Sequence, residues 1–554
     1  MFRSFFSAAI LVIMLGVADS ASAQGQILIY NNNLPGVGFN DPTPAAPVGG
    51  NPGTTLGQQR INVFLRAAEI WENRVNPTVD VLVLAQFTAL GTNVLGSAGA
   101  RTVFRDFPGA EFPGTWYPEA LANKLAGFDL QPCPVLALSC FDLTANFATT
   151  FNFYMGLDNN EGPGQQDLLA VILHELGHGL GFANFENEST GEFLVGFPDV
   201  YSQYTVDVET NKGWPEMTIA ERIASAINVR HVSWSGINVK KNVPTVLQPG
   251  EPAVNVVFPA IGPYPLGAAS FGPPLTAAGV TGDVVLALDA ADAAGPSTTD
   301  GCSTITNASA VSGRIALMDR GACGFTIKVK NAQDAGAIGV LIADNVLSEP
   351  APGLGGVDPT ITIPSGRVSL PDGNEIKANL PAVRLTLSID TSVLAGTDRI
   401  QGLMMLASFN PVIGGSSISH FEGVAFPNQL MEPAINPDLT TSLDVPQDLT
   451  ASLMTDIGWF SDQDGVPDGL DACLGSDLRP TVVIGTCDSG VANPLVSNGC
   501  TISDLIGNCA AKARNHGAFV SCVSNATNDL KKSGVITNGG KSSLQSCAAG
   551  AKIP

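Results

Sequence analysis

The chain has 554 residues, with 50 acidic and 27 basic side chains, and its formal net charge at pH 7 is −23. This acidic excess argues against proteins that bind nucleic acid or anionic lipid through a basic surface. Beyond the first residues, no stretch has the roughly 20 consecutive apolar residues that a membrane-spanning helix requires. We therefore expect no transmembrane segment, and a chain of this length is expected to hold several domains.

Residues 1–23 have the features of a secretory signal peptide. Arg3 gives a short basic start, residues 8–17 are apolar, and Ala-Ser-Ala at 21–23 forms a small-residue cleavage site. We therefore predict a secreted protein, with the extracellular medium, the periplasm and the cell surface all open as destinations.

The next segment predicts a helix followed by strands. After a Pro- and Gly-rich lead at 34–57, residues 60–75 place apolar side chains at helical spacing, and residues 79–87 (VDVLVLAQF) are typical of a strand. This order of elements favours a mixed α and β domain.

Residues 168–182 (LLAVILHELGHGLGF) contain the HExxH pattern of zinc hydrolases. On a helix, His174 and His178 lie on one face and can bind one ion, while Glu175 can reach a water on that ion. Gly179 and Gly181 predict that the helix ends just beyond the second histidine. Catalytic zinc usually takes three protein ligands and keeps one position for water, so a third ligand is required.

The third ligand does not stand where metzincin proteases place it. Their extended pattern, HExxHxxGxxH, is matched through Gly181, but Asn184 stands in place of the third histidine, and a neutral amide is a poor zinc ligand. The remaining histidines are His231, in a predicted strand (VRHVSW), His420 and His516. Carboxylates are a further alternative, without a matching motif: Glu186, Glu192 and Asp199.

Residues 268–390 predict a separate unit. An apolar run from 315, a turn, a helix at 326–335 and a second apolar run at 337–342 indicate a strand, helix and strand. The motifs DRGACGF, NAQ and IPSGRVSLPDGNEIK resemble those of a protease-associated (PA) domain. That resemblance implies a non-catalytic α/β insert that assists the binding of a substrate or partner, although a simple spacer is an equal alternative.

The segment GGSSISHFEGVAFPNQLMEPAIN, which follows the insert, resembles leishmanolysin-type metzincins. These zinc endopeptidases have HExxHxxGF, a long insertion before the third histidine, and then a methionine-containing turn beneath the metal. The resemblance implies that His420 is the third zinc ligand and that Met431 forms the turn. Residues 24–267 and 391–459 are then two parts of one metzincin-like catalytic domain. Phe421 departs from the tryptophan that often follows the histidine.

This reading implies a secreted zinc metalloendopeptidase that hydrolyses peptide bonds of protein or peptide substrates. Zinc activates a water molecule and Glu175 serves as the general base. A serine hydrolase is disfavoured because the chain contains no GxSxG motif. The alternative is a non-catalytic secreted binding or adhesion protein, in which the PA-like and calcium-binding parts act on an inactivated protease scaffold.

Residues 460–473 form an acidic, Gly-containing loop (FSDQDGVPDGLDAC) of the kind that supplies oxygen ligands to Ca²⁺. The predicted ligands are Asp462, Asp464, Asp468 and Asp471. The loop resembles one thrombospondin type 3 repeat, with Phe460 in place of the usual first aspartate. A solvated acidic linker is the alternative.

Ten cysteines, an even number in an exported chain, predict disulfides. Cys133 is expected to pair with Cys140 and Cys302 with Cys323. Six cysteines crowd the C-terminal end, around residues 474–554, and allow 15 pairings among which the sequence cannot choose. We therefore predict an α+β multidomain protein that ends in a small Cys-rich region; nothing in the sequence indicates its oligomeric state.

Overall fold

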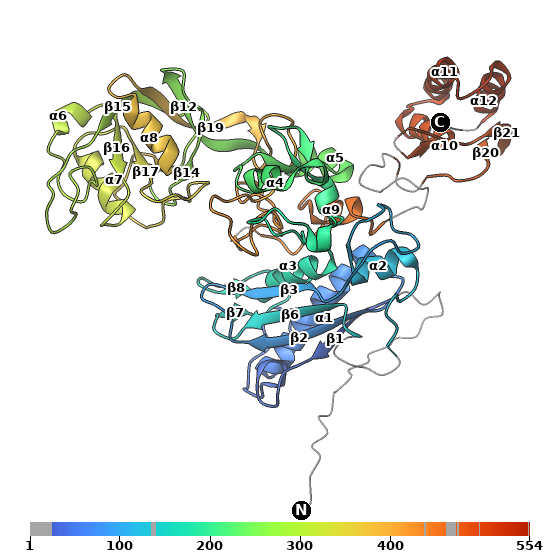
Figure 1. Ribbon diagram of the computed structural model, residues 1–554, viewed down its shortest axis with the longest axis horizontal. Coiled ribbons are helices and arrows are strands. Elements are labelled where there is room, and N and C mark those ends of the chain that lie inside the picture. Colours follow the sequence, from blue (N-terminus) through green and yellow to red (C-terminus); the bar gives the residue numbers. More distant parts are fainter. Residues whose placement is uncertain are drawn as a thin grey trace, which may run out of the picture.

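The computed structural model describes residues 25–133, 140–436, 439–460, 473, 476–497, 499–551 and 553. The predicted signal peptide, 1–23, lies outside them. Helices and strands are mixed in several units, which confirms the predicted multidomain α and β class. In Figure 1 the insert, in yellow-green, and the C-terminal region, in red, lie on opposite sides of the part of the molecule that contains α4 (Ile219–Ala226), α5 (Ile237–Val246) and α9 (Thr450–Asp456). Among the described residues, no helix is both long and apolar enough to cross a membrane.

The N-terminal unit is built on a four-stranded sheet, in the order β1 (Ile27–Asn31), β2 (Val81–Thr88), β6 (Leu143–Ala148) and β3 (Gly96–Ala100). β1, β2 and β6 run parallel, and the edge strand β3 runs antiparallel to β6. β2 alternates buried and partly buried side chains, as expected for a strand with one face on a core. Helix α1 (Leu56–Val75) packs on this sheet and buries Phe64 and Trp71.

Helix α3 (Leu168–Leu180) lies between β3 and α1 and carries the HExxH pattern (Figure 1). It begins after Asp167, whose carboxylate accepts a hydrogen bond from the amide of Leu169 at 2.7 Å. Every residue of α3 except His178 is buried. The indole Nε1 of Trp71 donates to the Leu173 carbonyl at 3.0 Å, which fixes α3 against α1.

Short elements connect these parts: η1 (Gly38–Asn40), β4 (Val103–Phe104), β5 (Tyr117–Pro118), α2 (Glu119–Ala126), β7 (Phe153–Tyr154), β8 (Gln166–Asp167) and η3 (Leu194–Gly196). A three-stranded sheet follows α3, in the order β10 (Lys212–Gly213), β9 (Thr205–Asp207) and β11 (Val232–Trp234). Around it lie η4 (Ser202–Tyr204), η5 (Trp214–Glu216), α4 (Ile219–Ala226) and α5 (Ile237–Val246).

The segment after the insert returns to this part of the chain through helix α9 (Thr450–Asp456), which packs on α5. The buried carboxylate of Asp456 accepts hydrogen bonds from the Trp234 indole and from the backbone amide of Asn238, each at 2.8 Å. Satisfied buried polar groups of this kind hold two distant segments in one arrangement. The parts of the chain before and after the insert therefore share one core.

The insert forms an eight-stranded sheet with the order β13-β12-β19-β15-β16-β17-β18-β14. Its central strands β15 to β18 run parallel, and β17 is buried throughout, as parallel strands covered on both faces are. The predicted strand, helix and strand are β16, α7 and β17. The bounds of its strands are β12 (Pro249–Phe258), β13 (Tyr264–Pro265), β14 (Gly267–Ala268), β15 (Val280–Leu286), β16 (Ile315–Asp319), β17 (Gly339–Ala343), β18 (Ser365–Val368) and β19 (Arg384–Leu394). Its helices are α6 (Ala308–Val311), α7 (Phe325–Asp334) and α8 (Leu370–Ala378).

The insert is wider than the predicted range of 268–390. Strand β12 pairs with β19, and Pro249 lies opposite Leu394, so the structural unit spans 249–394. The amide of Ala395 donates to the carbonyl of Gln248 at 2.9 Å, which places the two ends side by side. Neighbouring ends let a folded unit be inserted with little disturbance to its host.

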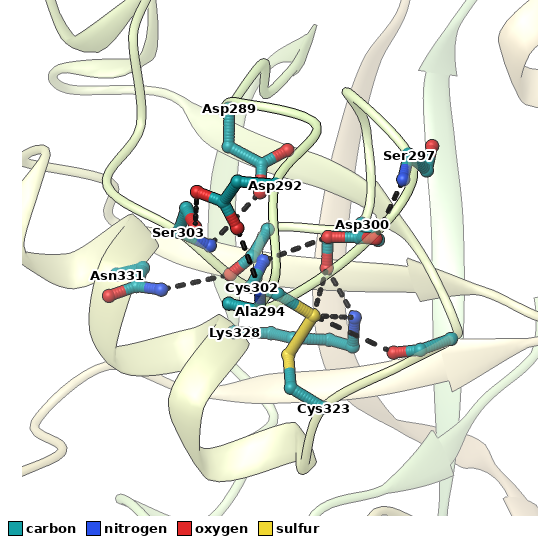
Figure 2. The surroundings of a disulfide bond; sticks show 12 residues. Asp289, Asp292, Ala294, Ser297, Asp300, Cys302, Ser303, Cys323, Lys328 and Asn331 are labelled. Carbon is teal, nitrogen blue, oxygen red and sulfur yellow. Dashed lines mark hydrogen bonds between the residues drawn. A yellow bond between two sulfur atoms is a disulfide. The ribbon is translucent and has the colours of Figure 1, made fainter.

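The predicted disulfide between Cys302 and Cys323 is present and joins the segment before β16 to the turn after it. Figure 2 shows Lys328 beside this disulfide, where its ammonium donates to the carbonyl of Asp300 and lies 3.4 Å from the sulfur of Cys302. The lysine is fully buried, so these contacts replace the water that its charge would otherwise hold.

The C-terminal region has a small core of its own. It contains β20 (Thr481–Ile484), β21 (Cys487–Ala492), β22 (Leu495–Ser497), β23 (Cys500–Thr501), α10 (Ile502–Lys512), α11 (His516–Lys532) and α12 (Asn538–Gly550). The structure selects one of the 15 pairings: Cys473–Cys500, Cys487–Cys547 and Cys509–Cys522. The predicted pair Cys133–Cys140 is confirmed. Such bridges stabilise a region with little apolar core.

Candidate metal centre

Helix α3 presents the two HExxH histidines one turn apart on one face. His174 and His178 place their Nε2 atoms 3.0 Å from each other. The helix ends at Leu180, two residues after His178, because Gly181 has a φ of +128° and the amide of Phe182 bonds back to the carbonyl of Gly177 at 3.0 Å. The chain thus turns away just beyond the histidines and leaves one side of them open.

A third histidine, His420, reaches the same point from beyond the insert. Its Nε2 lies 3.1 Å from that of His178 and 3.2 Å from that of His174. These three residues, the histidine cluster, are the one group of three or more His, Cys, Asp or Glu side chains that comes together closely enough to hold a metal ion within the described residues. Two of them are separated by 242 residues of sequence, so the tertiary fold assembles the cluster.

The outer nitrogens of all three imidazoles are held by backbone carbonyls. Nδ1 of His174 contacts the Leu430 carbonyl at 2.8 Å, that of His178 contacts Phe182 at 2.7 Å, and that of His420 contacts Ser416 at 3.0 Å. A carbonyl only accepts hydrogen bonds, so each Nδ1 must carry the proton. Each neutral ring therefore turns an unprotonated Nε2 lone pair toward the other two.

Three converging lone pairs repel one another unless they share a cation. Burial lowers the pKa of His174 and His420, and it lowers the pKa of His178 to about 3, with the neighbouring histidines adding to the effect. The rings are therefore held neutral, which is the form that binds a metal. Carbonyl bonds at the outer nitrogens are also the usual way in which histidine ligands are oriented.

The donor set fits zinc. A tetrahedral zinc with nitrogen ligands at 2.0–2.1 Å holds those nitrogens about 3.3 Å apart, and the cluster spaces them at 3.0–3.2 Å. Three imidazoles leave a fourth position for water or substrate, as catalytic zinc requires. The histidine cluster lines a cleft of about 610 Å³, together with β3 and residues 414–416 and 432–435.

Glu175 lines the same cleft and is 8% exposed. Burial raises the pKa of Glu175 to about 8, while a hydrogen bond from the backbone of Ala98 acts in the opposite direction. Strand β3 passes directly over this carboxylate. A Cβ on Gly96 would lie 2.7 Å from the Cγ of Glu175, so only glycine allows the strand to come so close.

Met431 lies beneath the histidine cluster and is fully buried. Its sulfur packs against α3 so closely that a Cβ on Gly177 would lie 2.9 Å from it. The carbonyl of Met431 accepts a hydrogen bond from the amide of Phe421 at 2.8 Å, and the preceding residue, Leu430, holds His174. The turn at Met431 therefore supports two of the three histidines from below.

The other predicted ligands lie away from the cluster. Nδ1 of His231 contacts the carbonyl of Val229, and His516 contacts backbone carbonyls of the C-terminal region. Glu192 is exposed, whereas Glu186 and Asp199 are buried in the loop that follows α3. The predicted calcium ligands lie outside the described residues: Asp462, Asp464, Asp468 and Asp471.

One contact at the site was not predicted. Asn184 stands at the position where metzincins have their third histidine. It forms hydrogen bonds with Ser419, the residue before His420. The backbone amide of Asn184 donates to the hydroxyl of Ser419 at 3.2 Å, and that hydroxyl donates to the side-chain oxygen of Asn184. The side-chain nitrogen of Asn184 in turn donates to Glu188 at 3.0 Å. Asn184 thereby links the loop after α3 to the segment that carries His420.

Comparisons with known proteins place a PA domain within the insert. The model of the PA domain family matches residues 280–376, and a second family model, described as SPBPB7E8-like, matches residues 114–204, which include α3. The predicted PA domain is therefore confirmed.

Short matches to curated proteins cover a small part of each partner. ER degradation-enhancing alpha-mannosidase-like protein 3 is 56% identical over 45 residues in Xenopus laevis and 52% identical over 46 residues in Homo sapiens. Each match covers 8% of this chain and 5% of the relative.

Solved structures that resemble part of the chain include two peptidases. The zinc aminopeptidase BSAP from Bacillus subtilis is 24% identical at a TM-score of 0.20, covering 26% of this chain and 31% of the aminopeptidase. A peptidase M28 precursor from Shewanella amazonensis is 18% identical at a TM-score of 0.19, covering 30% of this chain and 42% of the precursor. Similarity at this level does not assign a function to the histidine cluster.

Proposed function

We propose that the protein is a zinc-dependent metalloendopeptidase of the leishmanolysin-like kind, acting on protein or peptide substrates. The observation that carries the proposal is the histidine cluster. Three Nε2 atoms lie within 3.0–3.2 Å of one another, and each ring is oriented by a carbonyl at its outer nitrogen. His174, His178 and His420 would hold the zinc, with Met431 as the supporting turn.

When bound at these histidines, zinc supplies a Lewis acid that polarises a carbonyl and makes a water acidic near pH 7. Glu175 lines the same cleft as the three histidines and would act as the general base, taking a proton from a water molecule and giving it to the departing amine. Its raised pKa shows that the pocket itself disfavours the charge. A cation at the histidines would bring that pKa down again and favour the carboxylate that accepts a proton.

The edge strand β3 supplies a surface for the substrate. It ends the four-stranded sheet and lines the cleft beside Glu175. An extended peptide can add to such an edge through backbone hydrogen bonds, largely independently of its side chains. Recognition along an extended stretch favours cleavage at internal peptide bonds, which supports an endopeptidase.

The disulfides support the predicted export of the protein to an oxidising compartment. All ten form disulfides, and disulfides of this kind persist in oxidising compartments. Together with the predicted signal peptide, this supports a protein secreted from the cell or held at its surface. The PA domain would then assist in the binding of large substrates.

The test replaces the base without touching the ligands. In the zinc-loaded full chain, Glu175→Gln should retain one zinc per chain by metal analysis and should lose casein cleavage by roughly 1,000-fold or more. Glu192→Gln, the same change at an exposed position, should leave both quantities as they are. Full cleavage by Glu175→Gln, or a wild-type chain that binds zinc and cleaves nothing across a peptide library, would refute the proposal.

A further inference from the structure

A second buried polar group lies in the loop after α3 and takes no part in the histidine cluster. It consists of two carboxylates, Glu186 and Asp199, which we call the acidic pair, with the hydroxyl of Ser202 beside them. Glu186 is 8% exposed, Asp199 1% and Ser202 0%. Two carboxylates this deeply buried need something that compensates their charge.

Hydrogen bonds from the backbone satisfy only Asp199. Its carboxylate accepts the amide of Ser202 at 2.8 Å on one oxygen and the amide of Phe185 on the other. Among the residues that the structure describes, neither the carboxylate oxygens of Glu186 nor the hydroxyl of Ser202 form a hydrogen bond of normal geometry. The side chains of Asp199 and Ser202 are nevertheless close enough to act on the Glu186 carboxyl. The Glu186 carboxyl is thus faced mainly by a second acid and one hydroxyl.

The nearby basic side chain, Arg222, acts on Glu186 through its charge, but its hydrogen bonds go elsewhere. The Nε of Arg222 donates to the carbonyl of Gly191 at 2.7 Å, and its Nη1 donates to the carbonyls of Trp214 and Met217. The guanidinium also covers the ring of Phe193, with its carbon 3.8 Å from the ring centre. The hydrogen bonds of Arg222 therefore go to backbone carbonyls, and its guanidinium packs on this aromatic ring.

A third acid increases the negative charge around the pair. Glu188 acts electrostatically with Asp199, and burial together with Asp199 raises the pKa of Glu188. Burial and the adjacent Asp199 raise the pKa of Glu186 well above its ordinary value. One proton shared between Glu186 and Asp199 would remove one charge, but the second charge would stay buried.

We propose that Glu186, Asp199 and Ser202 form a binding site for a divalent cation of the calcium class, separate from the histidine cluster. Carboxylate and hydroxyl oxygens without nitrogen or sulfur donors are the ligands of a hard cation such as Ca²⁺. One bound ion would compensate both charges and bind the oxygens of Glu186 and Ser202. Water completes such a coordination shell, as it commonly does for Ca²⁺.

The position of the site gives the cation a structural consequence. Glu186 lies two residues after Asn184, which bonds to Ser419 beside His420. An ion at Glu186 and Asp199 would tie residue 186 to residue 199 and so order the loop from 185 to 202. That loop also holds Asn184 against Ser419.

The test measures Ca²⁺ binding in a protein whose other predicted calcium loop, residues 460–473, has been inactivated by substitution. In the zinc-loaded full chain, the background carries Asp462→Asn, Asp464→Asn, Asp468→Asn and Asp471→Asn. Calorimetric titration should show one Ca²⁺ per chain in this background. Glu186→Gln should weaken that binding by roughly tenfold or more, because it removes one charged ligand, and Glu192→Gln should not change it.

Three outcomes would overturn the proposal. The background could bind no Ca²⁺ at millimolar concentration, which would leave a shared proton as the compensating charge. Alternatively, Glu186→Gln could bind Ca²⁺ as tightly as the background does. If Glu186→Gln does not fold, hydrogen exchange is measured on the background that keeps Glu186. Ca²⁺ should slow exchange in residues 185–202, and unchanged exchange there refutes the site.

Discussion

The histidine cluster and the acidic pair are two buried polar sites that follow each other along the chain, and they differ in how their polar atoms are satisfied. In the cluster, every outer nitrogen bonds to a carbonyl, so the ring orientations are fixed and only the inner lone pairs are free. In the acidic pair, Asp199 is held by two amides, whereas among the described residues no hydrogen bond of normal geometry holds Glu186.

This difference separates two ways of preparing a buried site for a cation. Neutral imidazoles can be oriented in advance, because burial favours their uncharged form. Carboxylates cannot be left ionised in the same way, because burial of their charge is costly until a cation or proton arrives. We therefore expect the cluster to keep its geometry without metal and the acidic pair to change its stability with its ligand.

The largest effect is expected from His420→Ala. Two imidazoles would remain, with one side of the ion open to solvent, so zinc should be lost on dialysis against a mild chelator and peptide cleavage should fall by roughly 1,000-fold or more. His231→Ala is the matched control, because the hydrogen bond of its ring goes to the carbonyl of Val229, away from the cluster. Zinc kept in His420→Ala but lost in His231→Ala would break the assignment of the cluster.

A smaller effect should follow from Ser419→Ala, which removes the contact between the loop after α3 and the segment that carries His420. The hydroxyl of Ser419 is bonded to Asn184 both as donor and as acceptor. Its loss should weaken zinc binding by roughly tenfold, as the loss of outer-shell support commonly does. Competition with a zinc-sensitive dye measures this affinity, and Ser419→Thr, which keeps the hydroxyl, should restore it. An unchanged affinity in Ser419→Ala would mean that the contact does not position His420.

The pH dependence of stability should expose the acidic pair. A carboxyl whose pKa is raised in the fold keeps its proton to higher pH than in the unfolded chain. Stability is therefore lost as the pH rises from the ordinary pKa of 4.5 toward the raised value of Glu186. In calcium-free buffer, Glu186→Gln should become increasingly more stable than the unmutated chain over that rise, measured by urea unfolding. Added Ca²⁺ should narrow the difference at the upper end, and a difference that does not vary with pH would contradict a buried, unpaired carboxyl.

The smallest effect on both sites is expected from removal of the insert. Neither site contains a residue of 249–394, and the ends at Gln248 and Ala395 are already bonded, so a short Gly/Ser linker can replace the unit. Zinc content and cleavage of short peptides should stay within about twofold, because distant changes are close to independent. Cleavage of large proteins should fall further if the PA domain assists substrate binding. Equal loss on peptides and proteins would show that the insert supports the core.

The local elements could be predicted from the sequence because their signals are local. The helix carrying His174 and His178 follows from residue spacing, and the motifs between Asp319 and Lys377 were enough to identify the PA domain. His420 was reached through resemblance alone, since the cluster joins positions 242 residues apart.

The contacts between distant segments could not be predicted in this way. The bond between Asn184 and Ser419 spans 235 residues. The start of the insert depends on the pairing between β12 and β19. The sequence of β12 alone does not reveal that β19 is its partner. The burial of Glu186 and the passage of Gly96 over Glu175 likewise arise from tertiary packing, which leaves no periodic pattern in the sequence.

X-ray absorption at the zinc K edge of the zinc-loaded full chain tests the central assignment most directly. It should show three imidazole nitrogens and one further oxygen or nitrogen at about 2.0–2.1 Å, with no sulfur. The same measurement on any zinc retained by His420→Ala should show two imidazoles. A spectrum of the unmutated chain with only two imidazoles, or with a sulfur shell near 2.3 Å, would contradict the three-histidine centre.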